Sequence, residues 1–260
     1  MFKILKYSFY DLARSRWSYV YFLFYLLLSS VLLFLNNDLS KAIITLMNVV
    51  LILVPLIGTI FGVMYYYNSQ EFTTLLLAQP IKRSNVFLGQ YLGVACSLSI
   101  SLILGLGIPF MLYGLLQSTA IFNFLILLVV ATFLTFIFSA LAYNIALSNQ
   151  NKIKGFGYAI LLWLFMAVIY DGIVLISLVL LQEYPLEGLS LTAMLVNPID
   201  LARTLIILKL DISALLGYTG AVFKSFFGTS QGFFMSFLLL FVWVILPIIR
   251  IFVVSRKKDF

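Results

Sequence analysis

The chain has 260 residues, of which 63% are hydrophobic and 10% charged, with a net charge of +7. Soluble domains carry about a quarter charged residues, so this composition excludes an ordinary soluble protein and favours a multi-pass membrane protein. The sequence has no histidine and a single cysteine, Cys96. A histidine–cysteine metal site, a disulfide framework and a cysteine–histidine nucleophile are therefore excluded.

Apolar runs of about 20 residues without charge predict membrane-spanning helices. The stretch between Arg83 and Lys152 has 68 residues without charge, enough for two spans joined near residues 113–123. Pro55 is expected to kink the second span. The sequence thus predicts an all-α integral membrane protein with one permease domain over 1–260. Its six predicted spans are 17–35, about 42–67, two within 84–151, 155–181 and 233–254.

Basic residues indicate the orientation, because lysine and arginine in short loops stay in the cytoplasm. Twelve of the 16 basic residues fall on one side of the predicted spans, so both chain ends are expected to be cytoplasmic. The charge is dispersed over short segments, which favours contact with anionic membrane lipids and disfavours nucleic acid binding. The twelve are Lys3, Lys6, Arg14, Arg16, Lys82, Arg83, Lys152, Lys154, Arg250, Arg256, Lys257 and Lys258.

The first 16 residues predict an amphipathic helix before the first span. Phe2, Leu5, Phe9 and Leu12 recur at spacings of three and four, and the lysines occupy the opposite face. Two interpretations remain open: an anchor on the membrane surface, or a docking element for a cytoplasmic partner.

The longest predicted cytoplasmic loop follows the second span. Ser69 is expected to cap a short helix with Glu71 in its first turn, and Pro80 to end it. Ser84 or Asn85 is expected to cap the next span. Three consecutive leucines give the short helix an apolar ridge, which indicates a groove in a partner protein or the bilayer surface.

Asp171 is the one ionisable residue deep in a predicted span. A carboxylate there costs about 2.5–3.5 kcal/mol, so it should face the protein interior or water and have a partner. The possible donors are Tyr143, Asn144, Tyr158 and Tyr170. Two roles stay open: a hydrogen bond that holds the bundle or a dimer together, or a carboxylate that lines a translocation path.

The longest segment on the outer side, 182–232, stays rich in leucine, isoleucine and phenylalanine. This composition predicts helices that lie on the outer interface. Within it, Asn197 and Pro198 predict a turn before Asp200 and Arg203, which are three residues apart and can pair on one helix face. For this pair, a structural role that stabilises the segment is favoured over a contact with a substrate or a partner.

Several local patterns recur together in one order along the chain, from an amphipathic N-terminal helix to a basic tail. They are Arg14-Ser15-Arg16-Trp17, Glu71, Thr74-Leu75-Leu76-Leu77, Gln79-Pro80-Ile81, Arg83, Leu88-Gly89, Asp171 in an aromatic-rich span, Asn197-Pro198, Asp200-Leu201 and Arg203. In this combination the chain resembles the permease subunits of the ABC-2 class of ATP-driven transporters. Within that class it is most similar to the NosY group, the membrane subunits of the NosDFY systems for nitrous oxide reductase maturation.

The resemblance implies a homodimer in the bacterial inner membrane, with an elbow helix at 1–16, a coupling segment at 69–90 and an outer segment at 182–232. It implies that a cytoplasmic NosF-like ATPase is gripped through the elbow residues Arg14, Arg16 and Trp17. The implied ATPase-coupling residues are Glu71, Thr74, Leu75, Pro80, Lys82 and Arg83.

The same resemblance places ATP and Mg²⁺ on the partner ATPase and no cofactor on this chain, which is then not itself an enzyme. The sequence agrees, because it has no glycine-rich phosphate loop followed by Lys-Ser or Lys-Thr. A periplasmic NosD-like protein is implied at the outer face, in support of copper-site maturation. No metal site is expected in the chain, since its seven methionines are scattered.

Three other functions are less favoured. A generic ABC-2 exporter of a lipid, drug or glycan would share most of these patterns. A secondary transporter with Asp171 as its ion site is less favoured, because Pro55, Pro109 and Pro247 lack matching flanks in two halves. A membrane enzyme is least favoured, since acid–base chemistry needs several positioned groups.

Overall fold

The structure is a computed structural model that describes residues 1–36, 38–181, 186–209 and 230–257, and within these residues all regular structure is helical. Six helical segments are long and apolar enough to cross a membrane. They are α2 (Arg16–Leu35), α3 (Leu39–Asn68), α5 (Arg83–Leu112), α6 (Ile121–Ser148), α7 with η2 and α8 (Lys152–Leu180), and α12 (Ser230–Lys257). The prediction of an all-α membrane protein with six spans is confirmed.

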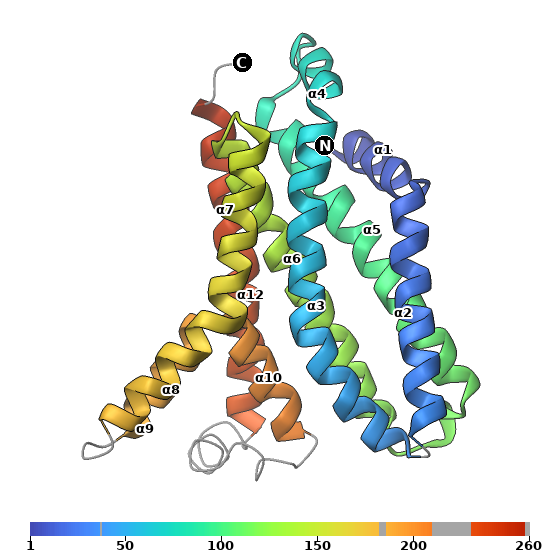
Figure 1. Cartoon of the computed structure of the whole chain (residues 1–260). Helices are drawn as coiled ribbons and strands as arrows, with labels where there is room; N and C mark the ends of the chain where they lie inside the picture. Colours follow the sequence, from blue (N-terminus) through green and yellow to red (C-terminus); the bar gives the residue numbers. More distant parts are fainter. Residues whose placement is uncertain (37, 182–185, 210–229, 258–260) are drawn as a thin grey trace.

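Two short helices lie at one end of the bundle. α1 (Phe2–Ala13) lies across the top of α2 and α5, and α4 (Gln70–Leu77) stands above α3 and α5 in Figure 1. The first residue and the end of α12 lie at the same end. We call it the basic end, because Lys82, Arg83 and Lys152 lie there, and we call the opposite end the distal end.

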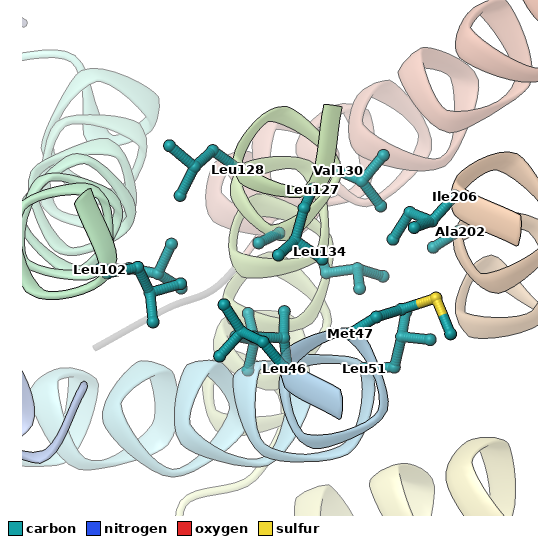
Figure 2. Packing of buried hydrophobic residues seen from close by; sticks show 14 of the residues in the cluster. Leu46, Met47, Leu51, Leu102, Leu127, Leu128, Val130, Leu134, Ala202 and Ile206 are labelled. Atoms are coloured by element: carbon teal, nitrogen blue, oxygen red, sulfur yellow. The ribbon is translucent and has the colours of Figure 1, made fainter. Parts of the chain in front are cut away.

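The core lies between α3, α5 and α6. In these helices 50–61% of the most apolar 18-residue stretch is buried, against 6% for the fifth span and 17% for α12. The fifth and sixth spans thus present most of their apolar surface to lipid or to another chain. Figure 2 shows side chains of α3, α5, α6 and α10 (Pro198–Lys209) meeting in the core. Those labelled are Leu46, Met47, Leu51, Leu102, Leu127, Leu128, Val130, Leu134, Ala202 and Ile206.

The turn predicted between the third and fourth spans is found after α5. Gly114 has φ +90°, a left-handed conformation that glycine adopts without steric cost. It leads into η1 (Leu115–Gln117) and then α6. Pro55 lies inside α3, which continues as a single helix from Leu39 to Asn68.

α1 packs closely on α5 through two glycines. The side of α1 that is buried carries Ile4, Ser8 and Leu12, and Gly89 and Gly93 of α5 face it. Of the predicted apolar face, Leu12 is buried against the bundle, whereas Phe2 is 84% exposed. The contact with α5 selects a stripe that lies between the predicted apolar residues and their polar neighbours.

Gly93→Ala is expected to destabilise the protein by about 1–3 kcal/mol, the range for overpacking a close contact. A Cβ at Gly93 would lie 2.6 Å from Cβ of Ser8 and 2.9 Å from the backbone nitrogen of Phe9. The matched control is Gly107→Ala on the same helix, where nothing lies within 4 Å of the added carbon. Thermal unfolding in detergent should show a lower midpoint for Gly93→Ala only. Equal midpoints for both variants would contradict this packing.

The fifth span runs as one helical stretch from Lys152 to Leu180, close to the predicted bounds, and contains a π-helical turn. It consists of α7 (Lys152–Leu164), the π-helix η2 (Phe165–Ile169) and α8 (Tyr170–Leu180). A π-helical turn inserts an extra residue and redirects the axis, and in Figure 1 α8 diverges from the bundle below α7. No residue of α8, which is described throughout, is buried within the chain.

The outer segment contains α9 (Leu186–Val196) and α10, which meet at an angle of 115°. α9 lies beside α8, whereas α10 turns into the bundle. Leu201, Ala202, Leu205 and Ile206 are all buried in the core. The prediction that this segment lies on the interface is therefore wrong for α10. Its remaining parts, 182–185 and 210–229, lie outside the described residues.

Candidate functional site

The residues assigned to ATPase coupling lie together on the surface of the basic end. Glu71, Thr74 and Leu75 are exposed on α4. Pro80 and Lys82 are exposed in the turn that leads to α5, and Arg83 is exposed as the first residue of α5. Glu71 occupies the first turn of α4, as the sequence predicts. Leu75, in the middle of the predicted apolar ridge, is 69% exposed, while Leu77 packs against the core.

The two capping predictions for this segment are wrong. The Ser69 hydroxyl does not cap α4 but donates to the carbonyl oxygen of Tyr66, 3.3 Å away in the preceding helix. α5 begins at Arg83 after Lys82, which makes no side-chain cap. Ser84 and Asn85 therefore lie inside the helix. Serine can bond back to the preceding turn as well as forward, so its presence alone does not fix a cap.

α4 is joined to the spans by a buried chain of hydrogen bonds. Nε2 of Gln90 in α5 donates to Oγ1 of Thr73 over 2.8 Å. The Tyr143 hydroxyl of α6 donates to Oε1 of Gln90 over 2.7 Å. All three side chains are buried. This Thr73–Gln90–Tyr143 link thus connects α4 to two spans of the core.

Sequence reasoning missed the role of Gln90 and considered Tyr143 only as a donor to Asp171. A signal for Gln90 was present, because an amide inside a long apolar stretch must find a partner when buried. The identity of that partner was not readable, since Thr73 and Tyr143 lie 17 and 53 residues away along the chain.

The elbow joins the same surface. The Tyr7 ring of α1 stacks on the Phe72 ring of α4 with centroids 4.5 Å apart. Arg14, Arg16 and Trp17 are exposed where α1 turns into α2, and the Ser15 side chain accepts a hydrogen bond from the Trp17 backbone N–H over 3.3 Å. α1 and α4 thus meet in one surface at the basic end, which we call the coupling surface after the role that we propose for it below.

A second polar group lies toward the distal end, around Arg203 of α10. Its Nη1 lies 2.9 Å from Oδ2 of Asp171 and 3.1 Å from Oδ1 of Asp200. The side chains of Asp171 and Arg203 are each 30% exposed and that of Asp200 is 17% exposed. The predicted ion pair between Asp200 and Arg203 is thus present, and Asp171 forms a second ion pair with the same arginine. The ion pair binds the fifth span to α10.

Asn197 holds the bend between α9 and α10. Its Oδ1 accepts the backbone N–H of Ile199, which caps α10. Its Nδ2 donates to Oδ2 of Asp200 over 2.9 Å and to the carbonyl oxygen of Met166 over 2.8 Å. Met166 belongs to the π-helix η2, so Asn197 connects this break in the fifth span to the start of α10. Pro198, as the first residue of α10, does not need a backbone N–H there.

Asp171 has the partner that its position demands, but the partner is not one of the expected donors. Tyr170 donates to the carbonyl oxygen of Ala193, Tyr143 to Gln90, and Asn144 to the carbonyl oxygens of Ala140 and Pro247. Tyr158 is exposed. Across the described part of the chain, no three histidine, cysteine, aspartate or glutamate side chains converge as a metal site would require.

No protein-family model matches the chain. It is 26% identical over 158 residues to a probable ABC transporter permease protein NosY of Stutzerimonas stutzeri, a match that covers 58% of this chain and 57% of the relative. It is 29% identical over 171 residues to the protein of the same name in Pseudomonas aeruginosa, over 62% of each chain. The chain is similar to NosY permeases. The resemblance predicted from the sequence patterns is thereby confirmed at modest identity. The chain spans about three-fifths of the length of the NosY relatives that it matches.

Proposed function

We propose that the chain is the membrane permease subunit of a NosY-like ABC transporter, with its basic end in the cytoplasm of a bacterial cell and its spans in the inner membrane. The observation that carries the proposal is the position of α4. Its exposed side carries Glu71, Thr74 and Leu75, and its buried side is hydrogen-bonded through Thr73 to Gln90 and Tyr143 of two spans. The similarity to two NosY permeases points to the same function.

In this proposal a cytoplasmic, NosF-like ATPase binds the coupling surface. ATP and Mg²⁺ are held by the ATPase, and this chain supplies no catalytic group. Closure of the ATPase moves α4, and the Thr73–Gln90–Tyr143 link carries that movement into α5 and α6. The Tyr7–Phe72 stack carries it into the elbow. Hydrolysis is thus coupled to a rearrangement of the spans.

We also propose that a second copy and a periplasmic NosD-like protein complete the assembly. The low burial of the fifth span and α12 leaves apolar surface for a second copy in the membrane. The contacts of Asn197, Asp200 and Arg203 are with one another and with neighbouring elements, which favours a structural role for these residues. The surface left for a periplasmic partner is then that of α8 and α9. The assembly would support copper-site maturation of nitrous oxide reductase.

Glu71→Lys and Arg83→Glu are expected to abolish ATP hydrolysis coupled to this chain, with ATPase co-purification reduced at least about tenfold. Charge reversal on an interface replaces attraction by repulsion, which costs several kcal/mol. The matched control is Lys152→Glu, an exposed charge reversal at the same end but outside α4. Membrane fractions should contain all three variants in equal amount. Normal ATPase binding and turnover in both coupling variants would refute the assignment of this surface.

A secondary transporter is the second candidate, because of the helix breaks near Asp171 and Asp200. The fifth span is π-helical just before Asp171, and α9 and α10 bend by 115° just before Asp200. Broken helices beside polar residues are typical of ion sites in such transporters. The engagement of both carboxylates by Arg203 disfavours this candidate. Ion uptake by the chain alone in vesicles, lost in Asp171→Asn, would select it.

A further inference from the structure

A cavity of about 170 Å³ lies at the basic end, where the α1–α2 corner meets the last turn of α3. It has room for several waters or for a small polar group. Six of its eight described lining residues carry a polar group, and Leu12 and Met64 are the apolar ones. The polar and aromatic residues that line it are Asp11, Ser15, Trp17, Tyr65, Asn68 and Ser69. The function proposed above assigns it no role.

Tyr65, one of the residues that line the cavity, has a buried hydroxyl group. Tyr65 is 6% exposed, and its hydroxyl has no hydrogen-bond partner among the described residues. The carboxylate of Asp11 and the hydroxyl of Ser8 lie close by, but neither meets it in hydrogen-bonding geometry. A buried hydroxyl without a partner costs about 1–3 kcal/mol, so this position favours a bound polar group.

Further buried hydroxyls without a partner in the described part of the chain lie on α1 and α2. Ser8 on α1 and Ser18, Tyr21 and Tyr25 on α2 are buried, and within the described chain their hydroxyls find no partner. Native proteins leave few such groups, and each needs an explanation such as water or a ligand.

The lining determines the chemistry of the occupant. Asp11 is the charged side chain among the described residues that line the cavity, so the occupant should be a cation. The rings of Trp17 and Tyr65 favour an organic ammonium, which is attracted to aromatic faces. Oxygen acceptors on Ser15 and Asn68 favour an ammonium with N–H groups to donate, that is, a primary one.

The outer face of α2 indicates where the rest of the molecule lies. Trp17, Val20, Phe24 and Leu27 are exposed and follow one another at spacings of three, four and three, which puts them on one face of the helix. This apolar stripe starts at the cavity and runs down the first span. Arg16, exposed beside Ser15 and Trp17, can reach a phosphate at the level of the headgroups. A phospholipid fits this arrangement from headgroup to tail.

We propose that the cavity binds the primary-ammonium headgroup of a zwitterionic phospholipid. The ammonium donates to the Asp11 carboxylate and the Tyr65 hydroxyl, the phosphate lies by Arg16, and the acyl chains follow the stripe on α2. The bound lipid joins the elbow to the first two spans. The site does not depend on the ATPase partner, and it is tested on the full chain alone.

The experiment is native mass spectrometry of the delipidated chain with three lipids of identical acyl chains. Phosphatidylethanolamine has a primary ammonium, phosphatidylcholine a trimethylammonium, and phosphatidylglycerol no cation. One phosphatidylethanolamine per chain should be retained at least about tenfold better than either of the others, as expected for a charged hydrogen bond. Equal retention of the three lipids would overturn the proposal.

Variants test whether the preference for phosphatidylethanolamine depends on the residues that line the cavity. Asp11→Asn and Tyr65→Phe should lower retention of phosphatidylethanolamine about tenfold, to the level of phosphatidylcholine. The control is Tyr19→Phe, an exposed tyrosine of α2 that does not line the cavity, and its preference should be unchanged. An undiminished preference in Asp11→Asn would overturn the proposal. So would displacement of the lipid by equimolar soluble glycerophosphoethanolamine, which would instead identify a site for free amines.

Discussion

Gln90→Leu is expected to destabilise the protein by about 2–4 kcal/mol, because it removes the centre of the Thr73–Gln90–Tyr143 link. The leucine leaves the Tyr143 hydroxyl buried without an acceptor, at a cost of about 1–3 kcal/mol. It also removes the bond to Thr73, which keeps only its bond to the Ser69 carbonyl oxygen. Thermal unfolding in detergent measures the loss. The control is Gln79→Leu, an exposed amide in the turn after α4, for which the midpoint should change little.

A double-mutant cycle separates the link from a general effect of the substitution. Tyr143→Phe alone leaves Oε1 of Gln90 without a donor, whereas Gln90→Leu with Tyr143→Phe removes both partners. The double variant should therefore lose less stability than the sum of the two single variants, by about 0.5–3 kcal/mol. Additive losses, or a Gln90→Leu midpoint equal to that of Gln79→Leu, would show that these residues do not act as a unit.

Arg203→Met is expected to destabilise the distal half of the bundle by about 1–3 kcal/mol. It leaves Asp171 and Asp200 without their shared cation. Removal of one partner from a fully buried pair costs about 3–5 kcal/mol, and the 30% exposure of Arg203 and Asp171 reduces that figure here. Asp171→Asn should cost less than about 1 kcal/mol, because Arg203 keeps Asp200.

Thermal unfolding and limited proteolysis of α10 measure both changes. Arg203→Met combined with Asp171→Asn should recover part of the stability that Arg203→Met loses, since one carboxylate is gone. If Asp171→Asn proves as damaging as Arg203→Met, the cluster is not held by Arg203. A loss of transport in Asp171→Asn with normal stability would give this carboxylate a functional role.

Composition made the spans predictable, because a charge-free apolar stretch of sufficient length has few alternatives to crossing a membrane. The same composition could not place α10. Leu201, Leu205 and Ile206 would suit an interfacial helix as well as the core in which they are buried. The π-helical turn in the fifth span was equally unpredictable, since the residues of η2 include no proline or glycine that would indicate it.

Polar contacts were predictable only where they are local. Asp200 and Arg203 pair across one helical turn, and the spacing alone indicates it. The pairing of Asp171 with Arg203, 32 residues apart, depends on the return of α10 to the fifth span. Gln90 and Tyr143 meet for a similar reason, because α5 and α6 pack side by side. These contacts follow from tertiary structure, which residue patterns do not encode directly.

The most direct test is co-expression of this chain with a NosF-like ABC ATPase from the same organism, followed by purification in detergent through a tag on this chain. We predict that the ATPase is recovered in equal amount and that the complex hydrolyses ATP. A chain that purifies alone and intact, with the ATPase left behind, would contradict the proposed permease function.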